Sequence, residues 1–357
     1  MKILVTGTAG FIGFSLARQL LNDNHEVVGI DNINDYYDVN LKYARLYQCG
    51  IDATDIAWHK AVRSSSYENY RFIRLNLEDK TELMNIFKLE KFDVIVHLAA
   101  QAGVRNSISN PEVYIQSNIV GFLNILEACR HHSISHLVYA SSSSVYGLNE
   151  QMPFSTSQGA NHPVSLYAAT KKSNELMAHV YSHLFKLPTT GLRFFTVYGP
   201  WGRPDMGYYL FADAILKNEP IKVFNQGMMK RDFTYIDDIV DGIVHVMEYP
   251  PESANDWNPL QPNPSISSAP YKIYNIGNDQ PVNLLDFIYE IEKNCGVKAR
   301  LELIDMQLGD VPATWADVND LVKNFDYKPH TSIQVGLRKF SSWFKNYHRS
   351  LHVKMAG

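Results

Sequence analysis

Tyr167 and Lys171 are a candidate pair for proton transfer, because they lie four residues apart in a segment with helical spacing and so share one helix face. A phenol, with an ordinary pKa of about 10, is a weak base at neutral pH, but a nearby ammonium lowers that pKa. The spacing alone is weak evidence in a chain with 21 tyrosines, and Tyr289 and Lys293 repeat it. We expect that second pair to lie on a solvated helix surface.

A run of four serines at residues 141–144 ends a predicted strand upstream of Tyr167, directly before Val145-Tyr146-Gly147. Strand ends and the starts of the following helices meet in one crevice of a parallel sheet. We therefore expect these hydroxyls to lie beside the phenol. The alternative is a polar strand end without a chemical role.

Three glycines follow the first predicted strand and open the first predicted helix, residues 11–22. Gly7, Gly10 and Gly13 let the backbone turn tightly and approach a pyrophosphate, which the helix N-terminus attracts. The spacing differs from GxGxxG by one residue between the first two glycines. The alternative is a tight strand–helix turn with no ligand.

An acidic residue at the end of the second strand favours the ligand-binding interpretation of the glycines. Asp31 follows Gly13 by nearly the interval of about 20 residues expected for the acid that accepts ribose hydroxyls. An acid here repels a 2′-phosphate, and Asn32 and Ile33 follow rather than an arginine, so the pattern favours NAD over NADP. The alternative for Asp31 is a strand-end turn residue.

Short apolar segments alternate with helical ones over the first half of the chain, which predicts a parallel sheet covered on both faces. The fold class we expect is α/β, a Rossmann-type doubly wound parallel sheet with a smaller C-terminal α/β lobe that binds substrate. The expected lobes are 1–192 and 193–357, with segments around 233–250 and 271–283 packing back on the first. Segment 47–70 has no strong period, and its role stays open. Expected strands are 2–6, 26–30, 71–75, 92–98, 136–141 and 189–198, and expected helices are 11–22, 81–89, 112–131, 165–185, 206–216, 237–247, 284–295 and 332–348.

Composition narrows the classes of protein. The 357 residues carry a formal charge of −4, so no basic excess points to nucleic acid, and the short apolar runs suit no membrane span. The three cysteines are far apart, and no Cys/His spacing indicates a metal site. We expect a cytoplasmic protein without metal.

Five motifs in order resemble the extended short-chain dehydrogenase/reductase family: the TGxxGxxG loop, the acid after strand two, HLAA at 97–100, the serine run before VYG, and YxxxK. Within it the chain is most similar to nucleotide-sugar epimerases, the UDP-glucuronate 4-epimerases above all. The resemblance implies NAD as cofactor, Tyr167 as base, Lys171 holding the nicotinamide ribose and lowering the pKa of Tyr167, and Ser142 bonding the reacting oxygen. The expected cofactor-binding residues are Gly7, Gly10, Phe11, Ile12, Gly13, Asp31, Asn32, Asn76, Leu77, Leu98, Ala99, Ala100, Tyr167 and Lys171.

Two positions of the serine run bear on the reaction type. In this family, sugar dehydratases carry an Asp-Glu pair and decarboxylases a Glu at the positions of Ser143 and Ser144. Serine hydroxyls cannot act as general acids or bases at their ordinary pKa values, so epimerisation is favoured over elimination.

The stretch RFFTVYGPWGRPDM at 193–206 resembles that of uronate epimerases, in which a threonine and an arginine receive a carboxylate. The likeness implies Thr196 and Arg203, and a guanidinium suits a carboxylate. The alternative is that Arg203 only pairs with Asp205 on its loop. The other substrate-binding residues that the resemblance implies are Ser142, Ser143, Ser144, Val223, Phe224 at the uracil, Arg231 at a phosphate, Gln307, and Asp310 at the ribose.

The expected activity is therefore NAD-dependent 4-epimerisation of UDP-glucuronate to UDP-galacturonate through a 4-keto sugar. One alternative is an epimerase of UDP-N-acetylhexosamines or their uronates, and another is a non-catalytic NAD-binding protein. For Arg231, the alternative is an ion pair with neighbouring Asp232. The family likeness further implies a homodimer formed through helices 112–131 and 165–185.

Overall fold

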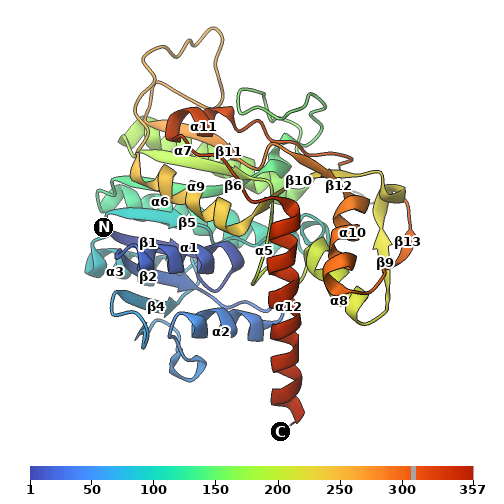
Figure 1. Cartoon of the computed structure of the whole chain (residues 1–357). Helices are drawn as coiled ribbons and strands as arrows, with labels where there is room; N and C mark the ends of the chain where they lie inside the picture. The colour runs from blue at the N-terminus through green and yellow to red at the C-terminus, as the bar shows by residue number, and fades with distance from the viewer. Residues whose placement is uncertain (307–310, 357) are drawn as a thin grey trace.

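One large parallel sheet organises the computed structural model, which describes residues 1–306 and 311–356, with side chains up to Arg349 (Figure 1). Within that part of the chain the sheet has the order β11-β7-β6-β5-β1-β2-β4-β3, and only β3 runs antiparallel to its neighbour. The predicted Rossmann-type fold class is thus confirmed. The strands are β1 (Lys2–Thr6), β2 (Glu26–Asp31), β3 (Ala61–Arg63), β4 (Tyr70–Arg74), β5 (Val94–His97), β6 (His136–Ser142), β7 (Thr189–Phe194) and β11 (Tyr271–Ile276).

Helices cover both faces of this sheet because its strands are apolar on both sides. One apolar core includes side chains of α1 (Phe11–Asn22) and α9 (Ile236–Glu248). A second core, on the other face, includes side chains of α3 (Lys80–Glu90), α6 (Gly121–His131) and α7 (Leu166–Phe185). Strand β11 and helix α9 come from the second half of the sequence, so both halves build the large sheet layer.

Smaller sheets lie beside the large one, with helices α8, α10 and α12 packed around them (Figure 1). One has the order β12-β10-β8 and the other pairs β13 with β9. None of the helices in the described ranges has the length and apolar character needed to cross a bilayer. These elements are β8 (Thr196–Tyr198), α8 (Gly207–Leu216), β9 (Pro220–Val223), β10 (Lys230–Tyr235), β12 (Pro281–Asn283), α10 (Leu284–Cys295), β13 (Arg300–Leu303), α11 (Asn319–Phe325) and α12 (Ile333–Ala356).

The predicted strand 189–198 is wrong as a single element, because the chain changes sheets within it. The backbone N–H of Phe195 donates to the carbonyl oxygen of Ile276 in β11, and Thr196 then pairs with Phe233 in β10. Strand β7 therefore ends in the large sheet and β8 begins in the small one. This crossing carries residues 196–206 over the cavity.

The predicted helix 112–131 is helical but not uniform, since α5 (Pro111–Tyr114) leads into a π-helical segment (Ile115–Val120) before α6. Apolar spacing does not reveal such a widened turn. Within it the buried Asn118 side chain bonds the backbone N–H and carbonyl of Gln101. The π segment thus supports the loop that follows β5.

Two further elements were not predicted from the sequence. Helix α2 (Val39–Gln48) begins at Asp38, whose carboxylate accepts a hydrogen bond from the Asn40 backbone N–H. Segment 47–70 forms a short 3-10 turn (Ala53–Asp55) and the edge strand β3. Tyr289 on α10 is exposed, as expected of a solvated pair.

A buried ion pair fastens α7 to the large sheet behind the serine run. Glu175 accepts from Arg193 Nε at 2.8 Å and Nη2 at 2.9 Å, and from the Ser141 hydroxyl at 2.7 Å. Burial alone would raise the pKa of Glu175, but the charge and hydrogen bonds of Arg193 outweigh it and lower that pKa to about 2. The pair therefore fixes the helix that carries Tyr167 against β7, and the Ser141 hydrogen bond fixes it against β6, which carries Ser142.

We expect Glu175→Gln to lower the free energy of unfolding by about 3–5 kcal/mol, because it leaves the Arg193 charge buried and unpaired. Chemical denaturation measures this loss. Asp213→Asn is the matched control, since Asp213 and Lys217 form an exposed pair on α8 worth less than about 1 kcal/mol. Equal losses in the two variants would contradict the structural role of Glu175.

Candidate active site

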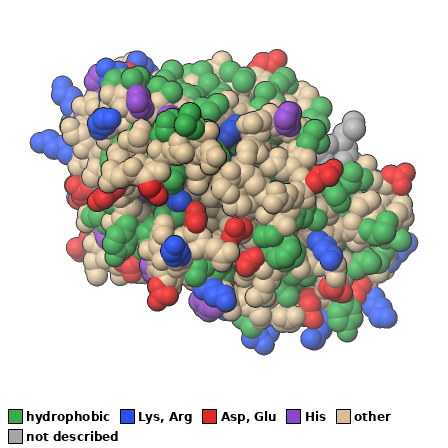
Figure 2. Space-filling view, turned by 90° about the horizontal axis from the view of Figure 1, so that it is seen from above, with side chains coloured by type: hydrophobic (Ala, Val, Ile, Leu, Met, Phe, Trp, Pro, Cys, Tyr) green, Lys and Arg blue, Asp and Glu red, His purple; other side chains and the backbone are tan. Residues whose placement is uncertain are grey.

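A cavity of about 970 Å³ lies at the carboxyl edge of the large sheet, between that sheet and the smaller ones. Its lining runs from the glycine loop past the serine run to the loop before α8. On the face seen from above, acidic and basic side chains are interspersed rather than gathered by sign (Figure 2).

The glycine loop has the close packing of a dinucleotide cradle. Gly7 adopts φ +82°, which favours glycine, and a Cβ there would lie 2.9 Å from the Ala99 backbone nitrogen. A Cβ at Gly13 would overlap the Gly7 carbonyl oxygen. Helix α1 begins directly after Gly10, so its N-terminal N–H groups face the cavity where a pyrophosphate would lie. The loop fits the group that the sequence predicts.

Asp31 ends β2 beside this loop and holds it in place. Its carboxylate accepts from the backbone N–H of Ala9 at 3.1 Å and of Ile33 at 2.8 Å. Asn32 donates from Nδ2 to Oδ1 of Asn76 at 3.0 Å, which joins the ends of β2 and β4. The predicted cofactor residues that line the cavity are Gly7, Gly10, Phe11, Ile12, Gly13, Asp31, Asn32, Leu77, Leu98, Ala99, Ala100, Tyr167 and Lys171.

Ser142, Tyr167 and Lys171 meet on one wall of the cavity. Ser165 caps α7 by accepting from the Ala168 backbone N–H, which places Tyr167 in the first turn. Burial raises the pKa of Tyr167, while a hydrogen bond with Ser142 and the charge of Arg203 lower it. Ser142 is thus within hydrogen-bonding reach of the phenol.

Lys171 is buried one turn further along the same helix, where its Nζ donates to the Ala140 carbonyl oxygen at 2.8 Å. Burial lowers the pKa of Lys171 to about 8. Its expected effect on the pKa of Tyr167 stays a prediction for the enzyme with its cofactor bound.

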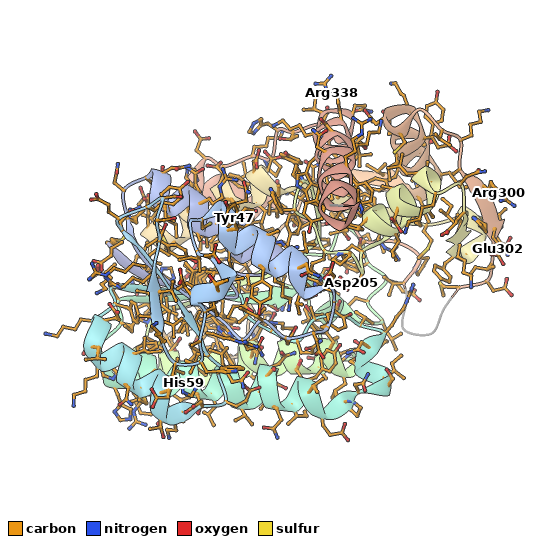
Figure 3. The ribbon with its side chains drawn as sticks, turned by 90° about the horizontal axis from the view of Figure 1, so that it is seen from below. Tyr47, His59, Asp205, Arg300, Glu302 and Arg338 are labelled. Atoms are coloured by element: carbon orange, nitrogen blue, oxygen red, sulfur yellow. The ribbon has the colours of Figure 1, made fainter. Side chains whose placement is uncertain are left out.

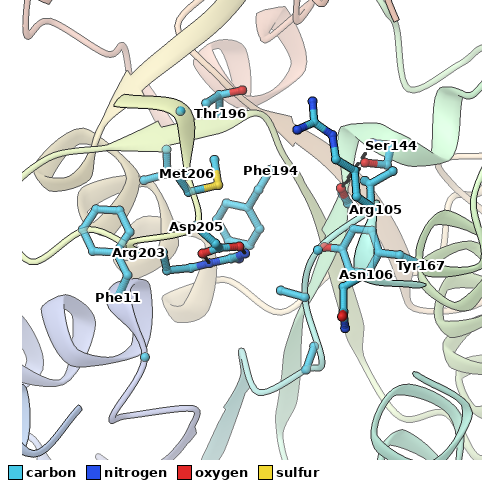
Figure 4. Close-up of a pocket in the computed structure, with 18 of the residues that line it drawn as sticks. Phe11, Arg105, Asn106, Ser144, Tyr167, Phe194, Thr196, Arg203, Asp205 and Met206 are labelled. Carbon is cyan, nitrogen blue, oxygen red and sulfur yellow. Dashed lines mark hydrogen bonds and ion pairs between the residues drawn. The ribbon is translucent and has the colours of Figure 1, made fainter. Parts of the chain in front are cut away.

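Arg203 and Asp205 form an ion pair in the same cavity, which Thr196 of β8 also lines (Figure 4). The guanidinium donates from Nε at 3.0 Å and from Nη2 at 2.6 Å to the two carboxylate oxygens. The pair considered as an alternative in the sequence is therefore present. Both side chains remain about 25% exposed and face the cavity, so pairing does not remove Arg203 from reach of a ligand.

The predicted nucleotide end is only partly assembled by the described residues. Phe224 lines the cavity, and the Arg105 guanidinium lies 4.6 Å from its ring centroid. Arg231 also lines it and donates to the Val311 carbonyl oxygen at 2.7 Å. The Val223 side chain is buried with those of Ile221 and Ile288 and is not part of the cavity lining. Gln307 and Asp310 lie outside the described residues.

Asp232, the neighbour of Arg231 in the sequence, is held in place by backbone groups. The Asp232 carboxylate, fully buried, accepts from the backbone N–H groups of Asn278, Asp279 and Ala316.

Ser143 and Ser144 line the cavity directly after Ser142. Small hydroxyls, rather than carboxylates, therefore form this part of the wall.

Sequence reasoning missed Arg45, which is fully buried on α2. Its guanidinium donates to the carbonyl oxygens of Ala9 at 2.9 Å, Trp201 at 2.7 Å and Gly202 at 3.1 Å. It thereby ties the glycine loop to the turn that precedes Arg203. The i, i+4 position of Arg45 after the apolar Leu41 was the available signal, but helix α2 itself was not predicted.

Comparison with known proteins agrees with this geometry. The NAD dependent epimerase/dehydratase family matches residues 3–277, and the chain belongs to this family. Protein CapI of Staphylococcus aureus is 54% identical over 98% of this chain and 100% of its own. A probable UDP-glucuronate 4-epimerase of Rhizobium meliloti is 44% identical over 99% of each chain.

A solved structure of similar shape comes from Bacillus cereus. It is a UDP-glucuronic acid 4-epimerase in complex with UDP-glucuronic acid and NAD, with a TM-score of 0.83 and 32% identity over 97% of this chain and 100% of its own. The likeness extends over both the large sheet and the smaller sheets.

We expect Lys171→Met to make the free energy of unfolding of the cofactor-free protein less dependent on pH. Burial lowers the pKa of Lys171 from 10.5 to about 8, so the unfolded chain binds this proton more tightly than the folded one. The resulting penalty is full below pH 8 and disappears as the pH rises towards 10.5. Relative to wild type, the variant should gain about 2–3 kcal/mol more unfolding free energy at pH 7 than at pH 10.

Urea denaturation at the two pH values measures this difference. Lys88→Met, at an exposed position on α3, is the control and should shift both values equally. A difference no larger than that of the control would show that Lys171 is not buried as a cation.

Proposed function

We propose that this chain is an NAD-dependent UDP-glucuronate 4-epimerase, which interconverts UDP-glucuronate and UDP-galacturonate. The observation that carries the proposal is that one cavity holds both Tyr167 with Ser142 and the Arg203–Thr196 wall, next to the glycine loop. The R. meliloti relative and the B. cereus structure bear the same activity in their names.

The residues of this chain divide the work of the reaction. Tyr167 removes the proton from the C4 hydroxyl, Ser142 hydrogen-bonds that oxygen, and Lys171 stabilises the tyrosinate. When bound by the glycine loop and Asp31, NAD would supply reversible hydride transfer at C4. Because burial raises the pKa of Tyr167 in the chain alone, positive charge brought by the cofactor has to offset that burial.

Epimerisation rather than elimination fits the wall beside Tyr167. Eliminating water from the 4-keto sugar needs a further acid and base, and Ser143 and Ser144 occupy the positions concerned. Reduction of the keto sugar after it turns is therefore favoured over elimination of water.

The substrate carboxylate is assigned to Arg203 and Thr196, since a guanidinium and a hydroxyl can donate to its two oxygens. We place the uridine diphosphate between Phe224 and Arg231, with Asp31 and the glycine loop holding NAD. In this assignment, residues 1–192 form the cofactor lobe, aided by segments around 233–250 and 271–283, and the rest of 193–357 forms the substrate lobe.

An apolar stripe on α7 supports a homodimer. Leu176 and Leu184 are 60% and 61% exposed, Val180 lies between them, and Leu123 of neighbouring α6 is exposed as well. Exposed apolar side chains aligned on adjacent helices are typical of a protein interface. The three buried, unpaired cysteines suit the reducing cytoplasm in which we place the protein.

Protein loaded with NAD should convert UDP-glucuronate to UDP-galacturonate with no added cofactor, and Tyr167→Phe should lower kcat by at least about 100-fold with its NAD content unchanged. Chromatography of the UDP-sugars measures this. A panel with UDP-N-acetylglucosamine and UDP-glucose tests the alternative. Absence of UDP-galacturonate, or a preference for the N-acetyl sugar, would overturn the proposal.

The double variant Leu176→Glu/Leu184→Glu should be a monomer, because it places charges on both sides of the proposed interface. Light scattering coupled to size-exclusion chromatography gives the mass. Leu260→Glu serves as control, since this side chain is 89% exposed in the loop before β11. A wild-type monomer, or a double variant that stays dimeric, would disprove the interface.

A further inference from the structure

Asp205 occupies one particular edge of the Arg203 guanidinium. It accepts from Nε and Nη2, which together form the side edge of that group. A guanidinium has five N–H donors, so three remain on Nη1 and Nη2. For these the structure records no protein acceptor among the residues it describes, and the group faces the cavity that also holds Tyr167 (Figure 4).

Tyr36 supports Asp205 from the other side of the cavity. Its hydroxyl donates to Oδ2 of Asp205 at 3.2 Å, and Tyr36 comes from the segment between β2 and α2. The phenol also packs against Gly103, where a Cβ would overlap its oxygen. Figure 3 shows Asp205 beside the first turn of α2. The carboxylate is thus held by Arg203 and by a segment that borders the cofactor site.

The charge state of Asp205 follows from these contacts. Burial alone would raise its pKa, but the charge and hydrogen bonds of Arg203 and the Tyr36 hydroxyl lower it. Asp205 is therefore ionised at neutral pH and already neutralises Arg203. A substrate carboxylate either competes with Asp205 for the same N–H groups or binds at the same time on the other edge.

The geometry favours simultaneous binding of Asp205 and the substrate carboxylate, because the side edge and the end of a guanidinium can each donate to one carboxylate. We propose that Asp205, supported by Tyr36, is a positioning residue that sets specificity for the substrate carboxylate: it holds the side edge of Arg203 and presents the Nη1–Nη2 end to the sugar. This inference rests on the proposed function.

Such an arrangement selects by shape more than by net charge. With Asp205 in place the pair is neutral overall, so it attracts anions weakly at a distance. A carboxylate can accept two parallel N–H bonds from the presented end, whereas a neutral hydroxymethyl group accepts fewer and leaves a donor unpaired. The fixed guanidinium plane also spares the entropy of ordering a long side chain when substrate binds.

Asp205→Asn tests the proposal, because the amide keeps the size but offers a single acceptor oxygen. We expect KM and the dissociation constant for UDP-glucuronate to rise about tenfold to a hundredfold, with kcat lowered by a smaller factor. The dissociation constant for UDP-glucose should change less than about threefold, so discrimination between the two sugars falls. Asp35→Asn, at an exposed carboxylate next to Tyr36, is the matched control and should keep wild-type values.

Tyr36→Phe removes only the supporting hydroxyl and should shift the same constants in the same direction by about threefold to tenfold. It decides the matter if Asp205→Asn does not fold, as judged by melting temperature and NAD content. Tighter binding of UDP-glucuronate in Asp205→Asn would show competition instead, and unchanged discrimination in the folded variants would also overturn the proposal. If the wild type itself does not convert UDP-glucuronate, the proposed function fails rather than this inference alone.

Discussion

The cavity depends on the hydrogen bonds that the buried guanidinium of Arg45 donates. It lies away from solvent and donates to backbone carbonyl oxygens of the glycine loop and of the turn before Arg203. A desolvated cation tolerates no missing acceptor, so both segments must keep the positions that satisfy it. Because carbonyl oxygens lie on the backbone itself, the contact fixes chain paths and not only side chains. The cofactor cradle and the Arg203 wall thereby acquire one common frame.

Sequence alone predicts the parts of the structure that follow from local patterns of residue type and spacing. The alternation of apolar strands and helices predicts the doubly wound sheet, and the glycines, Asp31 and the Tyr167 helix follow from spacing. It does not predict where the chain leaves one sheet for another at Phe195, because the strand pattern continues through 189–198 without a break. The crossing depends on partners far along the chain, since Phe195 still bonds Ile276 of β11 whereas Thr196 pairs with Phe233 of β10.

The candidate site shows the same division. Ser142, Tyr167, Lys171 and Arg203 can be assigned from motifs and do meet in one cavity. Asp205 could be named only as a local partner of Arg203, and Tyr36 could not be assigned at all, since its contact with Asp205 joins distant segments. Val223 shows that a motif position can have a buried side chain, so its expected contact with substrate stays a prediction. Motifs report groups that contact ligands, whereas the groups that aim them are set by tertiary packing.

The change of sheets at Phe195 has a consequence for how this protein can diversify. The chain passes from the large sheet to the small one at β8 and returns to the large sheet at β11. The elements from β8 onwards therefore do not form a separate continuous segment that recombination could exchange without affecting the large sheet. Point substitution on a retained scaffold, for example in the short stretch between β8 and α8, disturbs this arrangement less than exchange of a block would. Divergence within such a lineage should accordingly be gradual, with the backbone conserved while a few side chains are rewritten.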